Sequence, residues 1–317
     1  MTRPGLGLGF ALWVGVAAAG CTPSNKVKPG QPVMVSFGVV GPDGAPVELE
    51  TEAGRNPAPP LSKFFAVFDR LLDPAGIETL VDGSAEPNNG VATVTADGAE
   101  VASKVLYVPN GDAEFTLVYP PGPSITITPE MGLPSGAMVT VSLSADHVRS
   151  HDRTKPFKAG DNVPETLSFE TEALAVAIDV PQPPEGGTAP DPDAGTATDP
   201  DAGADADGGV AADGGAAPAP APPVDPTFVV NVTFNNNTAD GTGATISASA
   251  TVGGVAVAAL GAVVARAPDS ANAWTVSPPA EGWPAGAVVT VTVGASAADL
   301  FGKTLGTAVT ATFTVKS

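Results

Sequence analysis

The two histidines of this chain are the first candidates for chemistry, because they lie four residues apart in a segment that also carries acidic side chains. Residues 146–152 read Asp-His-Val-Arg-Ser-His-Asp, so that Asp152 directly follows His151. On a helix this spacing would turn the rings of His147 and His151 to one side, where they could bind zinc together with Asp152. A zinc site needs three or four converging ligands, however, and Arg149 would oppose a cation. We therefore expect His147, His151 and Asp152 to be loop residues, and a metal site or a hydrolase built on this loop is the alternative.

A second group of possible ligands is a run of aspartates in the middle of the chain. Asp191, Asp193, Asp199 and Asp201 occur in two copies of Asp-Pro-Asp-Ala-Gly. Calcium prefers carboxylate oxygens, but the EF-hand pattern also requires a third spaced acid and a downstream bidentate glutamate. Alanine, glycine and proline stand there instead. We expect a solvated acidic spacer, with calcium binding as the alternative.

Cys21, the only cysteine, closes an apolar N-terminal stretch. Arg3 precedes an uncharged run over residues 6–19, which is too short to span a bilayer and fits the core of a signal peptide. The run ends in Ala-Ala-Gly-Cys, residues 18–21, which resembles the lipobox of bacterial lipoproteins. The resemblance implies that residues 1–20 are removed and that the Cys21 thiol carries a diacylglyceryl group. Lipidation also accounts for a lone cysteine in an exported chain, which has no internal disulfide partner.

Charge and composition restrict the remaining functions. The formal net charge is −20, which disfavours binding to nucleic acid or to anionic headgroups, because both need clusters of lysine and arginine. The chain has no P-loop, no dinucleotide-binding motif and no Gly-x-Ser-x-Gly elbow, so we predict neither an enzyme nor a bound cofactor. Valine, threonine, alanine, glycine and proline are abundant while aromatic residues make up 5%. This composition is typical of short strands joined by tight turns.

The mature chain divides by composition into four segments. Residues 21–31 are the lipidated N-terminus and tether, and residues 32–180 and 227–317 alternate between apolar and polar side chains as strands do. Residues 181–226 hold no large apolar side chain, so we predict a disordered acidic linker spanning about 35–40 Å between two β-sandwiches. In the first region we predict strands over 33–40, 64–69, 90–95, 103–108, 114–119, 124–128, 137–145 and 166–172, and a helical turn starting at Pro74. In the second we predict strands over 228–234, 245–251, 255–260, 262–266, 273–277, 287–293 and 309–315, with Trp274 and Trp283 in the core.

An internal repeat links the two folded regions. Residues 129–141 and 279–291 match at a constant offset of 150 positions, including Pro-x-Gly-Ala at 134–137 and 284–287. Alternating residues precede each copy, so a strand, a Pro/Gly turn and a second strand recur. The two regions are therefore predicted to be copies of one domain type.

This unit resembles the bacterial Ig-like domains (SbsA type) of S-layer and cell-surface proteins. The resemblance rests on a strand followed by a Leu-Asp-Pro turn, on Leu-x-x-Gly-x-x-Val-Thr-Val, on an Asp-x-x-Gly-x-x-Leu loop and on a final Phe-containing strand. The matching segments are 68–74, 133–141, 167–171, 283–291, 299–305 and 311–315. It implies two Ig-like antiparallel sandwiches, and it implies no activity because the motifs are turns and core positions.

Together these features predict a non-enzymatic, lipid-anchored envelope protein that presents Ig-like domains for adhesion, ligand binding or envelope architecture. The membrane is the expected partner through the lipid on Cys21, and another envelope protein or a polysaccharide is the expected second partner. Thr22, in place of an aspartate after the cysteine, resembles outer-membrane sorting in Gram-negative lipoproteins. The sequons that begin at Asn231 and Asn236 are treated as chance.

Overall fold

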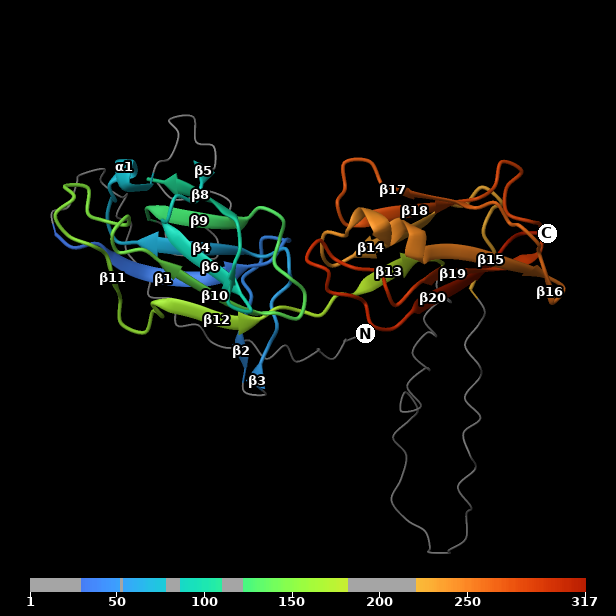
Figure 1. The fold of residues 1–317 in the computed structure, drawn as a ribbon, viewed down its shortest axis with the longest axis horizontal. Coiled ribbons are helices and arrows are strands. Elements are labelled where there is room, and N and C mark those ends of the chain that lie inside the picture. Colours follow the sequence, from blue (N-terminus) through green and yellow to red (C-terminus); the bar gives the residue numbers. More distant parts are fainter. Residues whose placement is uncertain (1–29, 52–53, 78–85, 110–121, 182–220) are drawn as a thin grey trace, which may run out of the picture.

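The computed structural model describes residues 30–51, 54–77, 86–109, 122–181 and 221–317. Over these residues the chain forms two β-sandwiches that lie along the longest axis of the molecule (Figure 1). Helix is limited there to the single turn α1 (Pro74–Ile77) and the 3-10 segment η1 (Asp240–Thr245). The predicted all-β fold and the helical turn at Pro74 are thus confirmed, while Cys21 and the predicted strand 114–119 lie outside the described residues.

The first sandwich has the strand order of an immunoglobulin domain. Its larger sheet runs β11-β1-β4-β9-β8-β5 and the facing sheet runs β12-β10-β6-β7. Strands β1, β4, β9 and β8 therefore take positions A, B, E and D, and β12, β10 and β6 take positions G, F and C. The strands are β1 (Val33–Val40), β4 (Lys63–Phe68), β5 (Glu86–Pro87), β6 (Ala92–Ala96), β7 (Ala99–Glu100), β8 (Ser103–Val108), β9 (Ser124–Pro129), β10 (Met138–Leu143), β11 (Lys158–Ala159) and β12 (Thr166–Glu170), with a hairpin of β2 (Glu50–Thr51) and β3 (Gly54–Arg55) between β1 and β4.

The second sandwich repeats this order. One sheet runs β13-β14-β18-β17, positions A, B, E and D, and the other runs β16-β15-β19-β20, in which β15, β19 and β20 are C, F and G. All pairings in both of these sheets are antiparallel. The strands are β13 (Val176–Asp179), β14 (Val230–Phe234), β15 (Ile246–Val252), β16 (Val255–Ala256), β17 (Val263–Arg266), β18 (Ala273–Ser277), β19 (Ala287–Val293) and β20 (Val309–Thr314).

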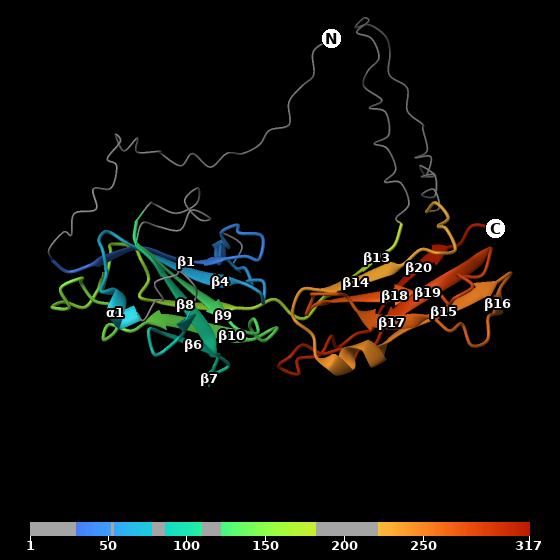
Figure 2. The same cartoon turned by 90° about the horizontal axis from the view of Figure 1, so that it is seen from above.

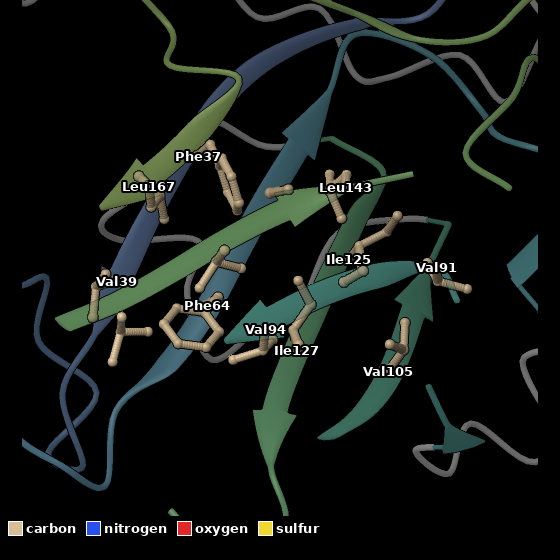
Figure 3. Packing of buried hydrophobic residues seen from close by; sticks show 14 of the residues in the cluster. Phe37, Val39, Phe64, Val91, Val94, Val105, Ile125, Ile127, Leu143 and Leu167 are labelled. Atoms are coloured by element: carbon tan, nitrogen blue, oxygen red, sulfur yellow. The ribbon is translucent and has the colours of Figure 1, made fainter. Parts of the chain in front are cut away.

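Alternation of side chains along the strands builds each core. In β10, Val139, Val141 and Leu143 are buried while Thr140 and Ser142 on the opposite face are partly exposed, as the period-two pattern predicts. These residues belong to one buried cluster with apolar side chains of the facing sheet, such as Phe64. Figure 3 shows Leu143 and Phe64 among the side chains of this core. The second sandwich has a separate core, whose fully buried members all lie between Leu174 and Val315.

The predicted boundary between the two domains is wrong. The sequence predicts that residues 176–179 belong to the first region, but they form β13, which pairs with β14 of the second sandwich, with Val176 opposite Phe234. Leu174 and Val180 are likewise buried in the second core. The composition shift at Pro181 suggested the boundary, but it marks the end of a strand rather than the end of a domain.

The predicted interdomain linker is therefore an insertion within the second sandwich. Before it, Val180 packs into the second core, and after it Val224 forms a parallel bridge with Val315 of the same sandwich. In the first sandwich the corresponding bridge joins Ala58 to Thr171, so residues 41–57 occupy the equivalent place between strand A and strand B. The two domains are joined instead by the short segment between β12 and β13, and the sandwiches lie next to each other (Figure 2).

Candidate functional site

The histidine loop connects β10 to β12 and does not assemble a metal site. Within it, residues 145–147 form a turn rather than a helix, and a second turn starts at His151. His147 is partly buried, with Nδ1 3.3 Å from the carbonyl oxygen of Gly76 in α1, whereas His151 is exposed. Among the described residues no three side chains of histidine, cysteine, aspartate or glutamate converge. The ring of His147 thus packs against the α1 turn, and the structure does not bring it together with His151 and Asp152.

Asp152 stabilises its own turn. Its Oδ1 accepts hydrogen bonds from the Ser150 hydroxyl at 2.5 Å and from the Thr154 hydroxyl at 2.8 Å, and from the Thr154 N–H at 3.1 Å. These bonds, led by that of Ser150, lower the pKa of Asp152 to about 2. The carboxylate is satisfied locally, which agrees with the loop role expected from the sequence.

The repeated Pro/Gly turn has the same backbone geometry in both sandwiches. We call residues 131–136 the junction turn and residues 281–286 the free turn. The N–H of Leu133 donates to Pro60 O at 2.8 Å, and the N–H of Trp283 donates to Pro226 O at 2.8 Å. Gly132 and Gly282 have φ of +82° and +85°, a left-handed conformation in which only glycine is unstrained. The sequence repeat is thus also a structural repeat.

The junction turn is the seat on which the second sandwich docks. Asn236, which follows β14, has no exposed surface. Its Nδ2 donates to Leu133 O at 2.8 Å and to Ser135 Oγ at 3.0 Å, and it lies 3.2 Å from Asp299 Oδ2. Its Oδ1 accepts the N–H of Asn237 at 2.8 Å. One buried amide therefore joins the first sandwich to two loops of the second.

Asp299 completes this network from the loop between β19 and β20. It has no exposed surface, and its Oδ2 accepts the Ser135 N–H at 3.0 Å across the junction. Its Oδ1 accepts the N–H groups of Phe301 and Lys303 at 2.9 and 2.8 Å, which closes the Asp-x-x-Gly loop. Three backbone N–H groups donate to this buried carboxylate and the Asn236 amide lies beside it, so Asp299 is satisfied by partners from both sandwiches.

Weaker contacts surround the buried pair. Asn235 Nδ2 donates to Ala173 O at 3.0 Å and lies 3.3 Å from Glu172 Oε2, and Asn237 Nδ2 donates to Met131 O at 3.1 Å. On the rim, Lys303 Nζ lies 3.0 Å from Asp97 Oδ2. The Met138 N–H and then the Lys303 ammonium lower the pKa of Asp97. Both side chains of this pair are about half exposed, so it adds little to the stability of the contact.

Two tryptophans take the structural positions predicted for them. Trp283 is 1% exposed, donates from Nε1 to Phe228 O at 2.6 Å and packs edge-on against Phe313. Trp274 is 6% exposed and donates from Nε1 to Thr238 Oγ1 at 3.0 Å, with the guanidinium of Arg266 over its ring. Both rings are core residues, as the sequence predicts.

Comparisons with known proteins add a remote structural likeness. No protein-family model and no curated protein sequence matches the chain. A similar solved structure is the N-terminal part of the bacterial S-layer protein SbsC, with 13% identity over 90% of this chain and a TM-score of 0.26. The match covers 44% of that chain, less than half its length. The Ig-like assignment rests on the strand order of this chain itself.

The junction could not have been found from motifs. The sequence predicts only a chance sequon at Asn236 and a loop position at Asp299. Nothing in the sequence indicates that these two side chains meet at Ser135. Three consecutive asparagines, 235–237, were the available signal, because such a polar run directly after a buried strand needs partners. Cys21 and the aspartates of residues 191–201 lie outside the described residues. Among those described, no helix is long and apolar enough to cross a bilayer.

Proposed function

We propose that the chain is a non-enzymatic lipoprotein of the cell envelope, anchored through a lipid on Cys21, which presents two Ig-like sandwiches as one rigid unit. The observation that carries the proposal is the position of Cys21, the sole cysteine, directly after an apolar signal-like run and Gly20. The buried contact of Asn236 and Asp299 with Ser135 supports the rigid presentation of the two domains.

The tether sets how far the unit stands from the bilayer. Eleven residues lie between Cys21 and Val33, the first residue of β1. A flexible chain of this length spans about 20 Å, and its fully extended limit is about 40 Å. The first sandwich therefore lies close to the membrane, and the second extends from it by the length of one domain. Adhesion, ligand binding and envelope architecture are all compatible with such a presenter, and outer-membrane sorting is the expected destination from Thr22.

Fractionation of cells tests the anchor directly. Wild-type protein should be recovered with membranes and should incorporate radiolabelled palmitate. The Cys21→Ser variant should lose both properties while remaining folded, because Cys21 lies outside both sandwiches. A Ser24→Ala variant in the tether is the matched control and should behave as wild type. Label in Cys21→Ser equal to that of wild type would refute lipid attachment at this residue.

A further inference from the structure

The free turn has the geometry of a docking seat, and none of the described residues occupies it as the second sandwich occupies the junction turn. In the junction turn, the carbonyls of Met131 and Leu133 accept side-chain amides and the Ser135 N–H donates to a carboxylate. The equivalent groups of the free turn are the carbonyls of Glu281 and Trp283 and the N–H of Ala285. Within the described residues none of these groups makes a hydrogen bond.

Exposure also separates the two turns. Ser135 is 3% exposed because the second sandwich covers it, whereas Ala285 is exposed. Beside the free turn lies a hollow of about 460 Å³, lined by Pro226, Leu260 and Trp283 among others. The same backbone geometry thus stands open at the far end of the second sandwich.

We propose that the free turn is a docking seat for an Ig-like domain of a partner protein, one that offers a side-chain amide after its strand B and a carboxylate in its F–G loop. The argument is that the same turn already holds such a domain within this chain through Asn236 and Asp299. This inference rests on the proposed presenting function and names the surface and the partner class that the function uses.

The two turns differ in the charged side chains at their rims. Gly136 N–H donates to Glu172 O and Gly286 N–H donates to Lys316 O, so Lys316 takes the place of Glu172. Glu172 faces the amide of Asn235, whereas Lys316 presents a half-exposed ammonium 2.7 Å from Asp225 Oδ1. The rim of the free turn thus carries the Lys316–Asp225 ion pair where the junction turn carries Glu172.

A second copy of the chain does not meet these requirements. The bridge between Leu72 and Ser150 corresponds to the bridge between Thr238 and Asp299, so the first sandwich has Ser150 in place of Asp299. By the same register it has Arg70 in place of Asn236. The loops that could dock, which carry Asn236 and Asp299, are already covered by the junction in each copy.

The loops of the second sandwich that carry Asn236 and Asp299 can serve as the docking probe once the junction is opened. In an unlipidated Cys21→Ser background, Ser135→Glu places a second carboxylate beside the buried Asp299 and should open the junction. The freed Asn236 and Asp299 should then dock on the free turn of another molecule, so sedimentation velocity should show concentration-dependent head-to-tail assembly. Adding the repeat-equivalent change, Ala285→Glu, should abolish assembly, whereas wild type and Ala285→Glu alone should be monomers.

A second measurement keeps the test decisive if Ser135→Glu leaves the junction closed. The fragment 173–317 has a self-contained buried core, and it is made with Ala285→Glu so that its own free turn cannot bind a second fragment. It should bind the full-length wild-type chain one to one, and binding should be lost when the full-length chain also carries Ala285→Glu. Any one of three results would overturn the proposal. These are an open Ser135→Glu chain that stays monomeric, assembly that survives Ala285→Glu, and a folded fragment that does not bind. Because these experiments are done in solution without lipid, their failure is distinct from a failure of anchoring.

Discussion

Replacing Asn236 with alanine should loosen the junction without unfolding either sandwich. The substitution removes an amide that donates to Leu133 O and Ser135 Oγ and lies against Asp299. It leaves buried acceptors on both sides of the contact, and each unsatisfied buried group costs about 1–3 kcal/mol. Since the Ser135 N–H and the rim contacts remain, we expect the docked state to lose about 2–3 kcal/mol. This corresponds to an approximately 30- to 150-fold increase in the population of the open state.

Hydrogen exchange at the amide of Ser135 measures this opening, because that N–H donates to Asp299 Oδ2 across the junction. In Asn236→Ala its exchange should accelerate by about 30- to 150-fold, the same factor as the shift in population. Exchange at Val141, deep in β10, should not change. Asn231→Ala is the matched control, since Asn231 is exposed on the same strand β14 and should leave the Ser135 amide unaffected. Equal exchange rates at Ser135 in wild type and Asn236→Ala would refute the assignment of Asn236 as the residue that holds the domains together.

Three further perturbations test the two sandwiches separately. Trp283→Ala should lower the free energy of unfolding of the second sandwich by about 3–5 kcal/mol, because it leaves a cavity and orphans the carbonyl of Phe228; a midpoint unchanged in differential scanning calorimetry would contradict its core role. Ile178→Asp should destabilise the second sandwich by about 1–3 kcal/mol and not the first, whereas loss of only the first transition would restore the boundary predicted from composition. The pKa of Asp152 is depressed on folding, so its contribution to stability is complete above about pH 4 and is lost as pH falls to about 2. Asp152→Asn should therefore flatten the loss of the first sandwich's melting temperature over that pH range, and parallel acid limbs in wild type and variant would disprove the role of its turn.

Most strands could be predicted because their side chains alternate. Strands β8, β18 and β19 begin and end at the predicted residues, and along each of them buried side chains alternate with more exposed ones. The 150-residue repeat predicted a shared turn, and Gly132 and Gly282 occupy equivalent left-handed positions in it.

The domain boundary and the junction contact could not be predicted, and each failure has a physical cause. Strand β13 is four residues long and has only Val176 and Ile178 to face the core, so its periodicity is too weak to compete with the composition change at Pro181. If β13 belonged to the first domain, the acidic segment 181–226 would be an interdomain linker, as the sequence predicts. The docking of Asn236 on Ser135 depends on contacts a hundred residues apart, which no local pattern encodes.

The mass of the mature N-terminus tests the central claim, attachment of a rigid pair of Ig-like domains through Cys21, most directly. Protein is extracted from the membrane fraction and digested, and its N-terminal peptide is analysed by mass spectrometry. The account predicts a peptide that begins at Cys21 and carries the mass of a diacylglyceryl group, with or without an additional acyl chain. A peptide that begins elsewhere, or one that begins at Cys21 with an unmodified thiol, would contradict it.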